Sequence, residues 1–325
     1  LGGFIAVGIV FCLIGFLVKM IGTSWIDIIF PPAAMGAIVA VIGLELMPPA
    51  AGMAGLTAKE PDPTTIMASI LTLAITIFAS IAFRGFLSTI PILIGVVSGY
   101  AIAAVSGLVD WTLVEKAPWF ALPTFYTPEF NFNAILIILP AALVVIAEHI
   151  GHLIVTGNIV GKDLTKDPGL DRSIFGNGIS TIISGFFGST PNTTYGENIG
   201  VLAITKVYST WVIGGAAIFA ILLSCLGKLA AAIQSIPTPV MGGVSMLLFG
   251  LIAASGIRIL VEQRVDYNKP ANLILTSVVM GLGVSTASIT IGPVALKGMA
   301  LATVVAIIMS LSFRVIDKVH GDKQA

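Results

Sequence analysis

Long apolar runs separated by short polar segments dominate the chain. Many runs approach the roughly twenty residues that an α-helix needs to cross a bilayer, and none has the alternation of a membrane β-strand. The pattern therefore predicts eleven spanning helices. They are expected at residues 1–21, 26–47, 64–83, 87–109, 134–156, 173–188, 194–206, 209–231, 237–257, 271–288 and 295–315.

Composition strengthens this prediction. Hydrophobic residues make up 57% of the 325 residues, charged residues 10%, and the mean hydropathy is +1.05. A soluble domain carries about 25% charged residues, so this chain cannot cover a water-facing surface. We expect an all-α polytopic membrane protein. A net charge of zero gives no sign of nucleic-acid binding, and Cys12 and Cys225, inside apolar runs, fit packing better than a disulfide.

Lysine and arginine are distributed unequally between the two sides of the membrane. With the C-terminus in the cytoplasm, twelve of them fall on the cytoplasmic side and four outside, as the positive-inside rule requires. The bias predicts a multi-pass protein with a cytoplasmic C-terminus. It also favours two crossings within 173–206. A single crossing there would place every upstream loop on the opposite side of the membrane.

A short motif occurs twice, as PPAAMG at 31–36 and PTPVMG at 237–242, 206 residues apart. Each copy opens a predicted span, and the charge bias puts the two openings on opposite sides. Such inversion is typical of transporters built from inverted repeats. At the same offset, the partners of spans 134–206 would precede residue 1, so about three N-terminal spans are expected to be missing.

A polar stretch, TPNTTYGENIG at 190–200, interrupts sequence that is otherwise apolar. Non-helical backbone at membrane depth is tolerated where it is buried in protein or lines a cavity. We expect 189–195 to run extended and Tyr195, Gly196 and Glu197 to open a half-helix. The free N–H groups of its first turn would then face a cavity, and Gly196 would let a ligand approach the backbone.

Two carboxylates stand alone among apolar residues, Glu148 and Glu197. A charge at the bilayer centre costs about 2.5–3.5 kcal/mol, so each is a candidate functional group, with an acid that joins two helices as the alternative. His152, four residues after Glu148, shares its helix face, and such a pair suits proton binding. His149 points elsewhere, and the spacing does not match a zinc site, so neither a metal nor a cofactor is predicted.

These groups restrict the ligand. An anion would meet two carboxylates, and a cation would meet the positive end of a half-helix. A neutral planar molecule with both N–H and C=O groups fits the carboxylates and the backbone donors together. Tyr195 would stack on that molecule or cap the half-helix, and the sequence leaves both open.

The segment ENIGVLAITK at 197–206 resembles the signature of the nucleobase–ascorbate transporter family, also called nucleobase:cation symporter-2. GSTPNTTYGENIG and VVIAEHIGHLIVTGNIV extend the likeness, which covers essentially the whole chain. The resemblance implies fourteen spans in two inverted repeats that form a core and a gate domain. Residues 1–21 and 134–231 would belong to the core, and 26–109 and 237–315 to the gate.

The resemblance also implies an activity, which is the import of uracil with a proton by alternating access, across the lipid bilayer of a bacterial inner (cytoplasmic) membrane. Glu148 would bind the N–H groups of the base, while Glu197 and the backbone at Gly196 bind the rest, beside Tyr195. His152, with Glu148 and Glu197, would serve proton coupling. The alternatives are a purine or xanthine permease of the same family and an anion transporter of the same architecture. An enzyme is not expected, and the fold is compatible with a homodimer through the gate domain.

Overall fold

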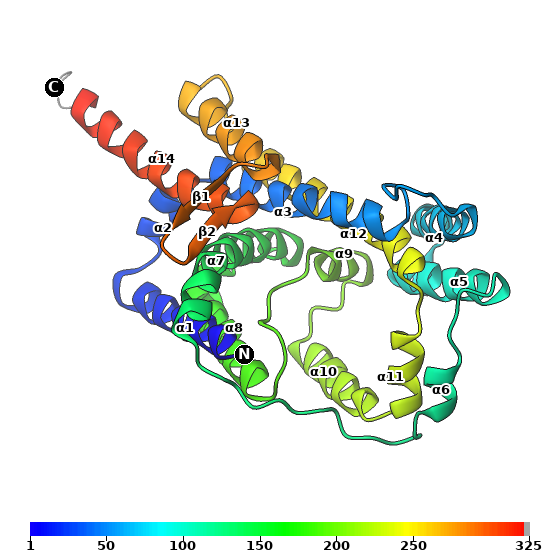
Figure 1. The fold of residues 1–325 in the computed structure, drawn as a ribbon. Coiled ribbons are helices and arrows are strands. Elements are labelled where there is room, and N and C mark those ends of the chain that lie inside the picture. The colour runs from blue at the N-terminus through cyan, green and yellow to red at the C-terminus, as the bar shows by residue number, and fades with distance from the viewer. Residues whose placement is uncertain (322–325) are drawn as a thin grey trace. The chain divides into compact units, whose positions relative to one another are not determined.

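The computed structural model describes residues 1–321, with their side chains except those of Glu197 and His320 (Figure 1). Fourteen α-helices occupy most of this range. Those in the first half are α1 (Gly2–Ile21), α2 (Ser24–Ile29), α3 (Pro32–Met53), α4 (Pro63–Ala82), α5 (Pro91–Val105), α6 (Thr112–Lys116) and α7 (Phe132–Val160). Those in the second half are α8 (Leu170–Phe186), α9 (Gly196–Thr205), α10 (Thr210–Ser224), α11 (Gly227–Gln234), α12 (Thr238–Glu262), α13 (Pro270–Val284) and α14 (Gly298–Gly321). A 3-10 helix (Gly85–Thr89), a π-helix (Thr165–Gly169) and two strands, β1 (Ser288–Ile291) and β2 (Val294–Lys297), complete the elements.

Helix length and apolarity confirm the all-α polytopic class. Within residues 1–321, six helices are long and apolar enough to cross a membrane, namely α1, α3, α4, α7, α12 and most of α14. Three shorter apolar helices are α5, α10 and α13. The total of eleven spans stays a prediction.

The chain divides into two compact units. The first contains residues 1–45, 125–199 and those from 252 onward, and the second contains 46–124 and 200–251. The boundaries fall inside α3, α9 and α12. The candidate site residues with described side chains all belong to the first unit.

Glycines let α1 and α8 pack closely within the first unit (Figure 1). A Cβ on Gly8 would lie 2.8 Å from the carbonyl oxygen of Gly178, and one on Gly15 would lie 2.9 Å from that of Asp171. Small residues allow such backbone contact between membrane helices, where van der Waals packing is a main source of association. α1 also packs along α7, the helix that carries Glu148 and His152.

The repeated motif makes matching contacts in the structure. Gly36 of the first copy packs against Leu260 near the end of α12, and Gly242 of the second copy packs against Ala54 just after α3. Gly36 and Gly242 are 206 residues apart (242 minus 36), and so are Ala54 and Leu260 (260 minus 54). Both copies also lie at the start of a helix, α3 or α12. The repeat seen in the sequence is therefore also a repeat of contacts.

The structure corrects the predicted span at 209–231, which is two helices, α10 and α11. Between them, Leu226 forms an antiparallel bridge with Phe120. The flanking backbone joins the same loop, with Ala121 N donating to Cys225 O (3.0 Å) and Gly227 N to Trp119 O (3.0 Å). These bonds divert the N–H and C=O groups that a continuous helix would use internally.

Two more boundaries differ from the sequence prediction. The span expected at 26–47 begins with a separate short helix, α2, because Pro31 and Pro32 cannot continue a helix, and Pro32 instead starts α3. The span expected from 295 begins at Gly298, because 288–297 form an antiparallel hairpin in which Ile291 pairs with Val294. Its turn contains Gly292, at a φ of 58°.

Candidate functional site

The middle of α7 carries a buried group of titratable side chains. Glu148 is 9% exposed, and His149 and His152 are each 4% exposed. Glu148 and His152 are one helical turn apart and therefore share a face, as the sequence predicted. His149 lies on another side of the helix, where its Nε2 atom is 2.8 Å from the hydroxyl of Ser173 on α8.

A break between α8 and α9 confirms the predicted interruption. α8 ends at Phe186, residues 189–195 form neither helix nor strand, and α9 begins at Gly196. Side chains of α8 bind the interrupted backbone, with Ser184 Oγ donating to Thr190 O (2.7 Å) and Asn192 N donating to Thr181 Oγ1 (3.2 Å). A non-helical segment among membrane helices needs such partners for its backbone.

Two adjacent threonines of the interruption reach the two site residues of α7. Thr193 Oγ1 donates to Glu148 Oε2 at 3.2 Å. Thr194 Oγ1 lies 2.8 Å from His152 Nδ1, with the direction of donation set by the tautomer of the ring. The sequence analysis did not identify these threonines as site residues. The sequence did contain a signal for them. Buried polar groups need hydrogen-bond partners, and the hydroxyl side chains of the polar interruption can supply such partners.

Gly196 and His152 lie close together at the start of α9. A Cβ placed on Gly196 would be 3.4 Å from His152 Nε2 and 3.5 Å from the hydroxyl of Ser255 on α12. The first N–H groups of the ten-residue α9 have no partners within that helix, and its dipole makes this end positive. Backbone donors and a histidine ring nitrogen thus lie together at the start of α9, and the buried carboxylate of Glu148 contacts the segment just before it.

Tyr195 is 63% exposed, so its ring is available for contact, and the choice between stacking and capping stays open. The backbone of Glu197 lies in the first turn of α9. Its side chain lies outside the described part of the structure. The ligand-binding and coupling roles expected for Glu197 therefore stay predictions.

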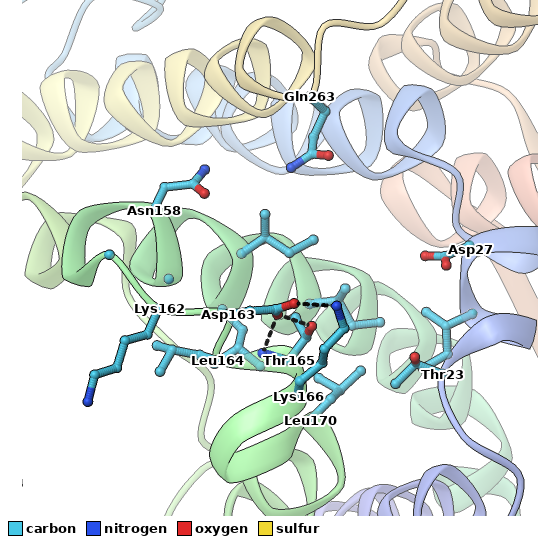
Figure 2. A pocket seen from close by; sticks show the side chains of 16 residues that line it. Thr23, Asp27, Asn158, Lys162, Asp163, Leu164, Thr165, Lys166, Leu170 and Gln263 are labelled. Carbon is cyan, nitrogen blue, oxygen red and sulfur yellow. Dashed lines mark hydrogen bonds and ion pairs between the residues drawn. The ribbon is translucent and has the colours of Figure 1, made fainter.

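A separate cavity of about 680 Å³ lies at the C-terminal end of α7 (Figure 2). Its lining includes Ile150, Leu153, Ile154 and Gly157 of α7. At about 100° per residue, these residues face away from Glu148 and His152, so the cavity is on the opposite side of the helix. It is therefore distinct from the candidate site.

The polar edge of that cavity is a local network. Figure 2 shows Asp163 joined to Thr165 and Lys166. Thr165 Oγ1 donates to Asp163 Oδ1 at 2.5 Å, and Lys166 Nζ is 3.0 Å from Asp163 Oδ2. The hydrogen bonds from Thr165 and Lys166 lower the pKa of the exposed Asp163 carboxyl below its usual range. This network stabilises the turn after α7, where solvent screens the ion pair.

Comparison with known proteins shows extended similarity to transporters. A model described as a permease family matches residues 1–292. The uracil permease of Escherichia coli strain K12 is 69% identical over 326 residues, covering 99% of this chain and 76% of that protein. The uracil permease of Paenibacillus larvae subsp. larvae is 63% identical over 100% of this chain and 78% of that protein. The uracil permease of Bacillus subtilis strain 168 is 45% identical, covering 95% of this chain and 74% of that protein.

Proposed function

The chain belongs to this permease family, and on that premise we propose that it imports uracil with a proton across the cytoplasmic membrane by alternating access. The observation that carries the substrate proposal is the high identity to proteins named uracil permease, over nearly all of this chain. The resemblance to nucleobase–ascorbate transporters rests on the same segments that form the candidate site.

The geometry is compatible with a neutral nucleobase. A uracil ring presents both N–H donors and C=O acceptors. Glu148 supplies a buried carboxylate as acceptor, and the start of α9 at Gly196 supplies backbone donors. Glu197 would complete the contacts, and Tyr195 would lie against the base. A charge-assisted bond from a base N–H to Glu148 would be stronger than one between neutral groups.

Proton coupling follows from the charge of the substrate. A neutral base gains nothing from the membrane potential, so accumulation against a gradient needs a co-transported charge. Glu148 and His152 are titratable, buried and on one helix face. His152 lies beside the start of α9, and Glu148 contacts Thr193 in the segment before it. We assign coupling to His152 together with Glu148 and Glu197.

Alternating access would move a core against a gate. We propose that residues 1–21 and 134–231 form the core and that residues 26–109 and 237–315 form the gate. Any homodimer would form through the gate. The reciprocal contacts of Gly36 and Gly242 support a pseudo-symmetric arrangement of α3 and α12, as two inverted repeats require.

Uptake into proteoliposomes tests this proposal directly. The protein would be reconstituted with an inward proton gradient and labelled uracil, with unlabelled uracil, adenine, guanine and xanthine as competitors. We expect uracil to compete best and a protonophore to abolish accumulation. Competition by xanthine but not uracil would favour a purine or xanthine permease. Accumulation that survives the protonophore would contradict proton coupling.

A further inference from the structure

We propose that the segment 117–122, which follows α6, lies at the boundary between lipid headgroups and acyl chains. Its three large apolar side chains, those of Trp119, Phe120 and Leu122, contact lipid there. The segment belongs to the second unit, together with α6, α10 and α11. The lipid contact is a binding surface beyond the proposed transport of uracil, and it does not depend on which substrate is carried.

The large side chains of this segment are left uncovered by the protein. Trp119 is 73% exposed, Phe120 78% and Leu122 79%. No charged residue occurs between Lys116 and Glu129. Exposed apolar patches mark contacts with proteins or membranes, and tryptophan is enriched where a bilayer meets water. Large exposed side chains on an uncharged segment therefore fit the bilayer boundary better than water.

The backbone of the segment is paired with the chain between α10 and α11. Phe120 forms the antiparallel bridge to Leu226, with a backbone hydrogen bond on either side of it. Gly227 lets the two chains approach, because a Cβ there would lie 2.5 Å from the Pro118 carbonyl oxygen. Non-helical backbone is tolerated at membrane depth where protein supplies its hydrogen-bond partners. The pairing therefore allows the segment to lie where water is scarce.

Lys228 of α11 also finds its partners within the protein. Its Nζ atom donates to Val114 O at 2.6 Å and to Glu115 O at 3.0 Å, at the end of α6. Carbonyl groups in the last turn of a helix have no N–H partner within that helix, and a lysine side chain can supply one. Figure 1 shows α6 beside α11, and the two helices are in contact. The segment that follows α6 is therefore held at both ends.

The length of α10 indicates the depth of this pairing. α10 has 15 residues, and no charge occurs between Lys206 and Lys228. At 1.5 Å per residue the helix is about 22 Å long, whereas the hydrocarbon core of a bilayer is about 30 Å thick. α10 alone therefore does not cross that core. At its Cys225 end, the following backbone and Lys228 are bonded to protein, as a position with little water requires.

The surroundings of α10 favour lipid over a second protein surface. α10 has no buried residue, and its side chains are exposed on every side. A partner protein would cover one face of such a helix, whereas a fluid apolar solvent surrounds all of it. The predicted orientation places the Cys225 end outside, because Lys116 and Lys228 are among the four basic residues assigned to that side. The lipid contact is therefore expected in the outer leaflet.

Spin labelling of the protein in lipid nanodiscs tests the proposal. Cys12→Ser and Cys225→Ser first remove the two native thiols. Single labels are then attached through Trp119→Cys, Phe120→Cys or Leu122→Cys, all at exposed positions where a label fits without repacking.

Glu60→Cys is the matched control, because Glu60 is an exposed residue of another loop in the same unit and on the same predicted side. We expect labels at 119, 120 and 122 to collide more with oxygen than with a water-soluble nickel complex. Their depth should be about 5–10 Å into the headgroup–acyl boundary. The label at 60 should show the reverse preference. Nickel access equal to that at 60 would put the segment in water and overturn the proposal. Protection from both reagents would mean that protein covers it, such as a second copy, and would also overturn the proposal.

Tryptophan fluorescence checks the same contact without a label. Trp25→Phe, Trp111→Phe and Trp211→Phe leave Trp119 as the single tryptophan of the chain. We expect lipids brominated near the headgroup end of the acyl chain to quench Trp119 more than lipids brominated near the terminal methyl group. Fluorescence that neither lipid quenches would contradict the lipid contact.

Discussion

Carboxylates bonded by threonine hydroxyls occur both at exposed chain turns and in the buried middle of α7. At the turns, Thr65 donates to Asp62, Thr112 to Asp110 and Thr165 to Asp163, each pair two or three residues apart. In α7, Glu148 accepts from Thr193, 45 residues away. The same bond thus serves two different purposes.

The exposed pairs stabilise local backbone. Asp62, for example, caps α4 by accepting from the backbone N–H groups of Thr64 and Thr65. Such a bond needs only neighbouring residues and water is its competitor. The buried pair joins a helix to an interruption in another part of the chain, where burial of an acid is expensive. The difference supports the role proposed for Glu148 in binding the base, whereas Asp62, Asp110 and Asp163 stabilise turns.

The largest expected effect is that of Glu148→Gln on uracil binding. The substitution keeps the shape but removes the charge that would accept base N–H groups. A charge-assisted bond worth about 1.5–3 kcal/mol corresponds to a roughly 10- to 150-fold weaker Kd. Equilibrium binding of labelled uracil measures this. Asp163→Asn is the control and should bind as wild type; an unchanged Kd for Glu148→Gln would remove its assigned role.

Glu197 extends the comparison to a second acid in apolar sequence. The N-terminus of α9 would favour an ionised carboxylate at this position, so we expect the protonation of Glu197 to respond to occupancy of the site. We expect Glu197→Gln to retain measurable uracil binding but to lose accumulation against a gradient, and Glu197→Ala to be worse in both. Binding and gradient-driven uptake measured side by side separate the two effects. Normal accumulation by Glu197→Gln would make it a structural acid and leave coupling to Glu148 and His152.

Sequence patterns identified what depends on local composition. The polar interruption predicted where the helix breaks and that α9 begins near Gly196, and helical periodicity placed Glu148 and His152 on one face. The pairing of Thr193 and Thr194 with them was not predicted, because it depends on how two distant segments approach. The separation of α10 from α11 was missed for the same reason, since Leu226 pairs with Phe120 more than a hundred residues earlier.

Thr193→Val is expected to change the Kd for uracil less than Glu148→Gln does. It removes the hydroxyl that donates to Glu148 while leaving the carboxylate. A hydrogen bond of about 0.5–1.5 kcal/mol corresponds to a roughly two- to tenfold change in Kd for uracil. Thr165→Val removes the equivalent bond at exposed Asp163 and should leave Kd unchanged. Equal Kd values for Thr193→Val and Thr165→Val would mean that the buried bond contributes no more to uracil binding than the exposed bond does.

The smallest effect is expected from the exposed pairs in acid. The hydrogen bonds from the Thr65 side chain, followed by those from the backbone of Thr65 and Thr64, lower the pKa of Asp62 below its usual range. A carboxyl whose pKa is lower in the folded protein contributes stability above its unfolded pKa, about 3.9, and loses it as pH falls through the folded value. Apparent melting temperature in detergent should therefore decline below about pH 4. Asp62→Asn should flatten part of that decline, with little change in uracil binding at neutral pH. Asp62 is exposed, and the hydrogen bonds of its side chain in the described part of the chain are to Thr64 and Thr65 of its own turn. A large loss of binding by this variant would therefore mean that the exposed and buried pairs do not differ in function.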